Sequence, residues 1–357
     1  MHQPCRVGLV FVSLVQMAWV LVARWFLPFQ TWEGLLWQHA FFDCDEPERT
    51  VLPAANLSGL EMVHVAYATE PRFFPNLLLS MVSLSRSLQD PGQCTIHVVL
   101  YDGDVESAGS LIDCFTRCLE LLPATPTVRV HRYEFDPLML KVSRYSRYRN
   151  HHVTAKPITW ARLRFEEYLP SVRRVLYLDT DTIVKSDVGA LYRMHMNYPL
   201  AAALDSLIER SNAVPDIIAD MSANNNISRI NIKYENYFCT GVMLMDLERW
   251  RAERLGVHID RWALRIPSRE PLRANWHDQD MLNLAFQGRV DLLDWRWNAM
   301  GMGLENYVPA HCVDGARILH FTPQPATWQT DWWWLRSWGG LRFKPHTDPL
   351  RSCPDLQ

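Results

Sequence analysis

The chain has 357 residues, of which 48% are hydrophobic and 21% are charged, and its formal net charge is −3 at pH 7. A chain of this length and composition suits one large globular domain, or at most two. The near-neutral charge and the absence of a Lys/Arg-rich run in the sequence argue against a nucleic-acid partner.

The first feature in chain order is Val7–Ala23, an apolar run without charges that lies between Arg6 and Arg24. With the apolar residues that follow, the segment 7–27 is just long enough to cross a bilayer as a helix. The alternative is a cleaved signal peptide, but the run is longer than a usual signal-peptide core and ends without a good cleavage site. We therefore expect a signal-anchor over residues 7–27, with residues 1–6 in the cytoplasm and the rest in the lumen. This is the topology of a single-pass type II protein of the Golgi or endoplasmic reticulum membrane.

Residues 28–61 are expected to form a stem, because they carry acids, prolines and a glycosylation sequon. Their aromatic residues, Phe42 among them, are too apolar for a simple linker and either pack on the domain or lie at the membrane surface. The sequons that begin at Asn56 and Asn226 are acceptors for N-glycosylation. Together with the anchor, they favour a lumenal domain and a glycoprotein.

Seven cysteines follow Cys5, and this odd number leaves at least one of them unpaired. Cys239 lies inside an apolar motif and is the expected free thiol. The other six can form up to three disulfides, with a connectivity that the sequence does not determine. They are Cys44, Cys94, Cys114, Cys118, Cys312 and Cys353.

Apolar runs and turn residues predict alternating strands and helices from Met62 onward. The expected strands are 62–68, 95–101, 128–135 and 174–178, and the expected helices are 74–87, 105–121 and 158–168. This alternation indicates an α/β fold, with a Rossmann-like, mostly parallel sheet and helices on both faces. Nucleotides bind such sheets at the carboxyl ends of the strands. We assign one domain to residues 62–345 and a C-terminal tail to residues 346–357.

Two acids end the last of these strands. The sequence Val175–Val184 places Asp179 and Asp181 one residue apart, and the apolar run resumes directly after them. Buried carboxylates are rare unless they are paired or bind a metal. Two of them at a strand end can share one hard divalent ion with the phosphates of a nucleotide. The other interpretation is an ordinary capped turn, since Asp-x-Asp alone is a weak signal.

Further motifs accompany this pair in a fixed order. They are 159–170, 237–250, 278–283, 297–298 and 320–328. This series resembles the retaining glycosyltransferases of family 8 over roughly residues 63–328. The resemblance implies a GT-A fold and a metal-dependent enzyme. Such an enzyme moves a sugar from a UDP-sugar to a glycan or glycoprotein, with retention at the anomeric carbon.

The resemblance implies a metal site made of Asp179, Asp181 and His320, the last of which ends an expected strand. The implied ion is Mn²⁺, with Mg²⁺ as the alternative, because an imidazole nitrogen suits manganese better than magnesium. A lone histidine on a strand is otherwise most often a packed core residue.

The resemblance also implies a set of donor-binding residues. They are Ala68, Glu70, Phe73, Arg162 and Asp205. Ala68 opens the loop that would hold the uridine, with Glu70 on the base and the ring of Phe73 stacked on it. Arg162 would contact the donor sugar or phosphate, and Asp205 would contact donor hydroxyls.

Asp278 and Gln279 open an expected helix, where Asp278 could simply act as a cap. In the family, these two side chains lie beside the anomeric carbon and are catalytic. Retention usually suggests a carboxylate nucleophile, but Gln279 is an amide and a poor nucleophile. The consistent chemistry is front-face substitution, in which a phosphate oxygen takes the proton of the attacking hydroxyl. The protein then contributes positioning and electrostatics.

Two departures from the family pattern matter most, one in the last motif and one at Cys239. A glycine and a diphosphate-binding lysine are usual where this chain has Pro323 and Ala326, and an asparagine is usual at Cys239. Three basic residues could replace the lysine, namely Arg317, Arg336 and Lys344. The rival hypothesis is therefore a degenerate family-8 domain that binds a nucleotide or glycan without turnover. A third hypothesis, another Asp-x-Asp enzyme such as a pyrophosphorylase-like protein, is disfavoured by the membrane segment and the sequons. The sugar, the acceptor, the linkage and the oligomeric state stay open.

Overall fold

The computed structural model describes residues 62–134, 138, 157–206, 237–265, 278–286, 288–302 and 308–322, together with Phe42, Cys44 and Glu48. The predicted anchor over residues 7–27, the sequons at Asn56 and Asn226, and the altered positions Pro323 and Ala326 lie outside the described residues. Within the described ranges, no helix is long and apolar enough to cross a bilayer.

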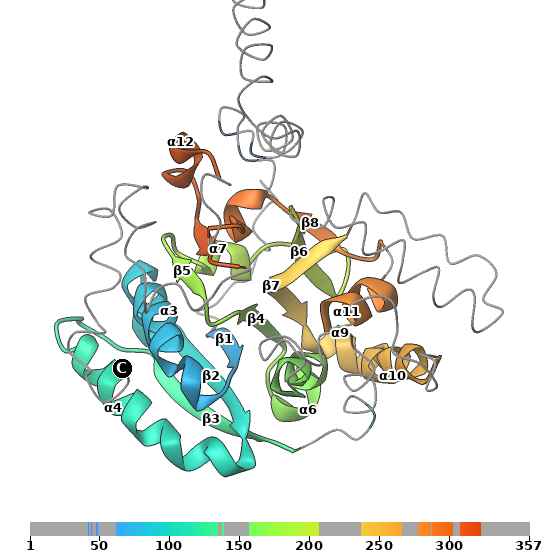
Figure 1. The fold of residues 1–357 in the computed structure, drawn as a ribbon, viewed down its shortest axis with the longest axis horizontal. Coiled ribbons are helices and arrows are strands. Elements are labelled where there is room, and N and C mark those ends of the chain that lie inside the picture. The colour runs from blue at the N-terminus through green and yellow to red at the C-terminus, as the bar shows by residue number, and fades with distance from the viewer. Residues whose placement is uncertain are drawn as a thin grey trace, which may run out of the picture.

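A seven-stranded sheet forms the centre of the domain, in the order β3-β2-β1-β4-β7-β6-β8 (Figure 1). Its strands are β1 (Val63–Ala68), β2 (Cys94–Tyr101), β3 (Thr127–Tyr133), β4 (Arg174–Leu178), β6 (Leu200–Leu204), β7 (Phe238–Asp246) and β8 (Asp291–Leu293). The first four are parallel to one another, and β6 is parallel to β8. β7 is antiparallel to both of its neighbours, β4 and β6. The predicted mostly parallel α/β sheet is therefore confirmed, with one reversed strand inserted in it.

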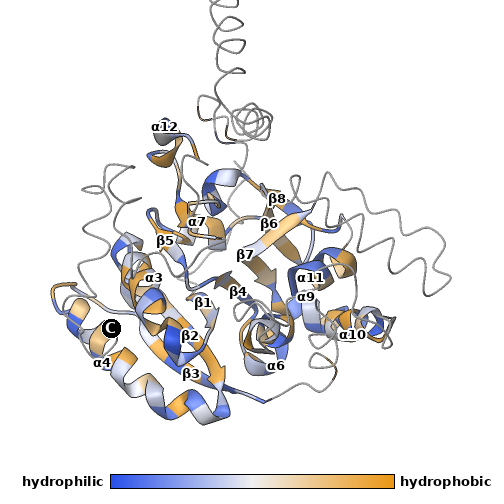
Figure 2. Cartoon of the chain, viewed as in Figure 1, coloured by the Kyte–Doolittle hydropathy of each residue, from blue (hydrophilic) through white to orange (hydrophobic). Residues whose placement is uncertain are grey.

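Helices cover both faces of this sheet (Figure 1). One face carries α3 (Phe74–Ser87), α4 (Ala108–Cys118) and α7 (Gly189–Tyr192), and the other carries α6 (Phe165–Tyr168), α9 (Leu247–Ala252), α10 (Leu255–Arg265) and α11 (Asp278–Phe286). α4 is amphipathic (Figure 2): Leu111, Cys114 and Phe115 are buried, and its polar residues face outward. β2 is buried almost throughout, as expected for a strand that is covered on both sides.

The segment before β4 differs from the predicted helix over residues 158–168. The structure has a 3-10 helix, η5 (Pro157–Arg164), followed by the single turn of α6. The side chain of Arg162 bends back to the carbonyl oxygen of Thr159 (3.2 Å) and enters buried ion pairs described below. These contacts outweigh the α-helical preference of the segment. α4 is likewise shorter than predicted, because the 3-10 helix η3 (Asp102–Ser107) replaces its first turns.

A second, two-stranded antiparallel sheet consists of β5 (Thr182–Val184) and β9 (Ile318–His320). β5 follows the two acids after β4, and its pairing with β9 places Thr182 opposite His320. The 3-10 helix η8 (Trp295–Asn298) and α12 (Ala310–Val313) contribute to an apolar cluster around this pair. The small sheet thus returns the chain near residue 320 to the carboxyl end of β4.

Part of the predicted stem packs on the domain. Among the described cysteines, Cys44 and Cys312 form a disulfide. Phe42 is buried in the same apolar cluster as β5 and β9. Phe42 therefore packs on the domain, which is the first of the two alternatives given for the aromatic residues of the stem. Cys239 is a buried thiol, as predicted.

Candidate active site

Asp179, Asp181 and His320 come together at the carboxyl end of β4. Asp179 follows β4 directly, Asp181 precedes β5, and His320 ends β9. The Nε2 atom of His320 lies 3.3 Å from a carboxylate oxygen of Asp181 and 3.7 Å from one of Asp179. One potential ligand atom from each residue lies within 4.8 Å of the other two. The three predicted metal ligands therefore form one cluster.

Hydrogen bonds hold the turn that carries the two acids. The Asp179 amide donates to the Gly241 carbonyl oxygen on β7 (2.8 Å), and the Phe321 amide donates to the Asp181 carbonyl oxygen (2.9 Å). The Thr182 hydroxyl donates to the Asp179 carbonyl oxygen (2.8 Å). The turn is thus attached both to the main sheet and to the residue that follows β9.

A hydrogen bond determines which nitrogen of His320 faces the acids. Its Nδ1 atom is 2.9 Å from Oδ1 of Asn298. An amide oxygen can only accept, so Nδ1 donates this hydrogen bond, and Nε2 is the nitrogen that faces Asp179 and Asp181. Metal-binding histidines are commonly oriented by the partner of their other nitrogen. Asn298 is thus a supporting residue of the site, and its only signal in the sequence is its place in the motif 297–298.

The cluster concentrates negative charge in a buried place. Burial raises the pKa of Asp179 and the charge of Asp181 adds to the shift, although Arg162 opposes it. Burial alone would lower the pKa of His320, but the Asp181 carboxylate raises it well above its ordinary value. The two carboxylates therefore attract a positive charge to this point. Two carboxylate oxygens and an imidazole nitrogen are a donor set that fits a divalent cation such as Mn²⁺.

Arg162 connects the acidic cluster with the start of α11. Its guanidinium forms ion pairs with Asp278, the first residue of α11, and with Asp179 (3.2 Å). Burial disfavours the guanidinium charge, but Asp278, Tyr177 and Asp179 together offset this and raise the pKa of Arg162 above its already high ordinary value. The neighbouring Arg164 points elsewhere and pairs with Asp260 on α10. The permanently charged Arg162 therefore joins two other predicted site residues, Asp179 and Asp278.

Tyr177 also contacts the cluster, although the sequence did not single it out. Its hydroxyl donates to a carboxylate oxygen of Asp179 (2.5 Å). Burial raises the pKa of Tyr177 well above its usual value, so it stays protonated and remains a donor. Tyr177 lies two residues before Asp179, on the same face of β4, and the period of the strand is the signal that could have found it.

Gln279 is held between Asp205 and Thr240. Its Nε2 atom donates to the Asp205 carboxylate (2.6 Å). Its Oε1 atom accepts from the amide (3.0 Å) and the hydroxyl (3.2 Å) of Thr240 on β7. Both ends of the side-chain amide are therefore engaged, which orients it. Asp205 follows β6 directly, so a predicted donor-binding residue and a predicted catalytic residue are in contact.

The predicted uridine loop lies at the same edge of the sheet, because β1 and β4 are parallel neighbours. Ala68 is the last residue of β1, and the 3-10 helix η1 (Pro71–Phe73) follows. Arg72 lies 3.4 Å from the Glu70 carboxylate and 4.5 Å from the ring centroid of Phe73. The nucleotide contacts of Ala68, Glu70 and Phe73 stay predictions, at the edge where nucleotides bind such sheets.

Known proteins similar to this chain are glycosyltransferases by name. The family model "Glycosyl transferase family 8" matches residues 64–331. Probable galacturonosyltransferase-like 3 of Arabidopsis thaliana is 30% identical over 310 residues, which cover 85% of this chain and 81% of that protein. Probable galacturonosyltransferase-like 7 of the same plant is 27% identical over 299 residues, which cover 82% of this chain and 73% of that protein.

A solved structure of the galactosyltransferase LgtC, in complex with donor and acceptor sugar analogs, has a similar fold. The TM-score is 0.58 at 18% sequence identity, and the match covers 80% of this chain and 95% of that chain. At this identity the similarity concerns the fold. The family model, in contrast, spans most of the chain and includes each of the predicted metal ligands. This chain therefore belongs to glycosyl transferase family 8.

Proposed function

We propose that this protein is a metal-dependent, retaining glycosyltransferase that moves a sugar from a UDP-sugar to a glycan or glycoprotein. The observation that carries the proposal is the cluster of Asp179, Asp181 and His320 beside the ion pair of Arg162 and Asp278. Relatives named galacturonosyltransferase-like and a galactosyltransferase of similar fold leave the sugar open between a uronic acid and a neutral sugar.

Asp179, Asp181 and His320 would hold Mn²⁺, or alternatively Mg²⁺, whose charge would offset that of the diphosphate leaving group. The proton on Nδ1 of His320, held by Asn298, keeps Nε2 available as a ligand. Arg162 and Tyr177 would restrain Asp179 in the orientation that the ion requires.

The contacts of Asp278 and Gln279 support front-face substitution. Gln279 is an amide engaged at both ends, and the Asp278 carboxylate is engaged in a buried ion pair. The amide of Gln279 cannot act as the carboxylate nucleophile of retaining glycosidases does, and Arg162 engages the only carboxylate of this pair, Asp278. The acceptor oxygen would bond to the anomeric carbon as the bond from that carbon to the phosphate oxygen breaks. The hydroxyl proton would pass to a phosphate oxygen, while Asp205 and Gln279 hold the sugar in place.

We also infer a type II protein whose domain faces the lumen of the Golgi or endoplasmic reticulum. The disulfide between Cys44 and Cys312 supports an oxidising compartment. The apolar segment 7–27 and the sequons at Asn56 and Asn226 point the same way.

One contact favours the rival function, binding without turnover. Arg317 is a candidate replacement for the family lysine that this chain lacks at Ala326, but its guanidinium pairs with Glu48 at 2.6 Å. The acidic cluster and the bonded Gln279 favour an active enzyme. Turnover of a donor separates the two functions.

The Asp179→Ala and Asp181→Ala variants test the metal site. Each should abolish Mn²⁺-dependent UDP binding in calorimetry, because the ion would lose one of its carboxylates. Asp113→Ala, on the exposed side of α4, is the control and should bind UDP like the unaltered chain. Unchanged UDP affinity in both site variants would show that the assignment is wrong.

A panel of UDP-sugars, incubated with the protein and Mn²⁺, tests turnover. An active enzyme should slowly hydrolyse at least one donor even without its acceptor. UDP binding without hydrolysis or transfer from any donor would instead support the rival function.

A further inference from the structure

A segment of the predicted stem lies against the part of the domain that carries His320. The structure describes three residues of this segment, and we call them the clasp. They are Phe42, Cys44 and Glu48. Phe42 is 2% exposed and packs edge-on against Trp295 of η8, with ring centroids 5.1 Å apart. The clasp is therefore part of the folded domain, although it precedes the first strand.

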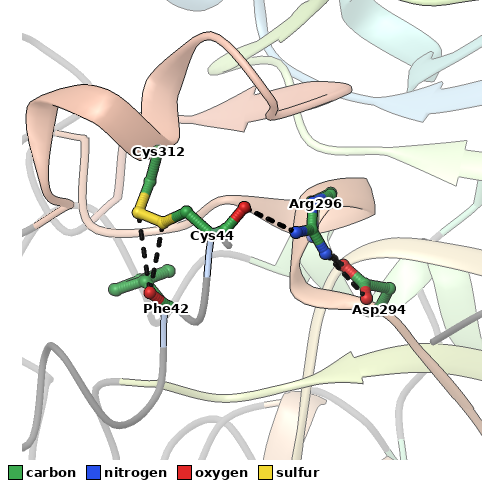
Figure 3. The surroundings of a disulfide bond; sticks show 5 residues. All are labelled: Phe42, Cys44, Asp294, Arg296 and Cys312. Atoms are coloured by element: carbon green, nitrogen blue, oxygen red, sulfur yellow. Dashed lines mark hydrogen bonds and ion pairs between the residues drawn. A yellow bond between two sulfur atoms is a disulfide. The ribbon is translucent and has the colours of Figure 1, made fainter. Parts of the chain in front are cut away.

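Cys44 fixes the clasp covalently. Its disulfide with Cys312 joins it to α12, and its carbonyl oxygen accepts a hydrogen bond from Arg296 (3.4 Å; Figure 3). Arg296 is in turn held by the Asp294 carboxylate at 3.1 Å (Figure 3). The clasp thus contacts both α12, which precedes β9, and η8, which lies beside β9.

Glu48 bridges the same two stretches of chain through its carboxylate. One oxygen accepts from the indole Nε1 of Trp297 (2.7 Å). The other accepts from Nε (2.9 Å) and a terminal nitrogen (2.6 Å) of Arg317. The guanidinium of Arg317 lies over the Trp297 ring, 5.4 Å from its centroid. The Glu48 side chain is 18% exposed, so solvent screens this bridge only in part.

Both partners of Glu48 adjoin the residues that orient His320. Trp297 directly precedes Asn298, which holds Nδ1 of the imidazole. Arg317 directly precedes β9, which ends at His320. Glu48 therefore holds β9, which carries the predicted ligand His320, against η8, which carries Asn298, the residue bonded to Nδ1 of His320.

These two stretches are also buried and joined by main-chain contacts. β9 pairs with β5 over three residues. Main-chain hydrogen bonds of 2.7, 2.9 and 3.0 Å join residues 317–320 to residues 296–299. An isolated pair of short strands is marginally stable in water. Contacts from outside the pair, including the bridge through Glu48, therefore contribute to how firmly His320 is held.

We propose that Glu48 is a positioning residue for His320, and that the clasp makes the N-terminal segment a working part of the metal site. This inference rests on the metal-dependent function proposed above. Without the bridge, residues 297–298 and β9 can separate slightly, and the imidazole can turn away from Asp179 and Asp181. The site would weaken although every ligand is still present.

The first test compares Mn²⁺ binding by the full chain and by its Glu48→Gln and Glu253→Gln variants. Glu253 is a matched control, because it also bridges through its carboxylate, to Arg249 (3.4 Å) and Arg289 (2.6 Å). Calorimetry should show a Mn²⁺ affinity that is lowered about 5- to 50-fold in Glu48→Gln. The affinity should be unchanged in Glu253→Gln. Equal Mn²⁺ affinity in Glu48→Gln and the unaltered chain would overturn the inference.

Pulsed EPR of the bound Mn²⁺, at saturating metal, separates positioning from general destabilisation. Imidazole coordination appears as nitrogen coupling, and this coupling should weaken in Glu48→Gln and persist in Glu253→Gln. Full nitrogen coupling in Glu48→Gln would show that the residue does not act through His320. Failure of the unaltered chain to bind Mn²⁺ would refute the metal site itself, and the inference with it.

The disulfide provides a second variant, in case Glu48→Gln does not fold. Cys44→Ser should lower Mn²⁺ affinity in the same direction. A phosphine reductant, added to the folded unaltered chain, should reproduce this loss and should have no further effect on Cys44→Ser. If neither the reductant nor Cys44→Ser changed the Mn²⁺ affinity, this result would contradict a contribution of the clasp to the metal site.

Discussion

The missing side chain of Gly241 allows His320 to reach its place. A Cβ atom at this position of β7 would lie 2.1 Å from Cε1 and 2.7 Å from Nδ1 of the imidazole. Such a contact is far inside van der Waals distance, and the ring cannot yield without leaving Asn298 or the acids. Gly241 also supplies the carbonyl oxygen that holds the Asp179 amide. The glycine of this motif is therefore required for close packing within the site.

Gly241→Ala should damage the metal site more than the fold. Overpacking of a buried position costs about 1–3 kcal/mol. The displaced imidazole should also lower Mn²⁺ affinity by roughly 10- to 100-fold. Thermal unfolding and Mn²⁺ calorimetry measure the two effects. Gly109→Ala is the control, since a Cβ there meets nothing within 4 Å, and it should be neutral or slightly stabilising. Wild-type Mn²⁺ affinity in Gly241→Ala would contradict this packing argument.

At the scale of elements, the strands that deliver the site could be predicted from local sequence. β4, β6 and β9 are short apolar runs that end at or just before Asp179, Asp205 and His320, and this pattern marks a strand that ends at a site. The reversed direction of β7 could not be predicted, because strand pairing depends on contacts between distant segments. The ion pair between Arg162 and Asp278 could not be predicted either, because the two residues are far apart in the sequence.

A row of three histidines crosses β1, β2 and β3. Nδ1 of His64 lies 3.0 Å from Nε2 of His97, and Nδ1 of His97 lies 2.9 Å from Nε2 of His131. His97 is 2% exposed. Burial, with contributions from His131 and His64, lowers the pKa of His97 to about 3. The folded protein therefore keeps the central imidazole of this row neutral at pH values where an unfolded chain would protonate it.

His97 should make stability depend on pH. Its pKa is lower in the folded than in the unfolded chain, so the unfolded chain binds more protons between about pH 3 and pH 6.5. The stabilising contribution is therefore complete above pH 6.5 and is lost as the pH falls toward 3, by at most about 1.4 kcal/mol per pH unit. Denaturant unfolding between about pH 4 and pH 7 should give a shallower pH dependence for His97→Gln than for the unaltered chain. His195→Gln, at an exposed position, should keep the steeper dependence. Equal slopes in all three proteins would exclude His97 as the cause.

At the scale of the whole molecule, the disulfide joins the predicted stem to the last described part of the domain. Cys44 and Cys312 are separated by 268 residues, so the bond closes almost the entire domain into one covalent loop. A crosslink over a long loop stabilises the folded state by about 2–4 kcal/mol, mainly by restricting the unfolded chain. This contribution exists only where the bond can form. The disulfide therefore favours an oxidising compartment.

Glycosylation tests that compartment and the proposed topology together. If the domain faces the lumen, Asn56 and Asn226 are exposed to the glycosylation machinery, and each can carry a glycan where the chain around it is accessible. The full chain made in animal cells should gain mobility on gels after treatment with a peptide N-glycosidase. The Asn56→Gln and Asn226→Gln variants assign the shift to each site, and the double variant should show none.

Alkaline extraction of the membranes should leave the full chain in the pellet, because a helix over residues 7–27 would hold it there. A chain that shows no glycan at either position, and is extracted by alkali, would contradict the signal-anchor and the lumenal assignment together. A glycosylated chain that is released from the membrane would instead favour the cleaved signal peptide, with the domain still in the secretory pathway.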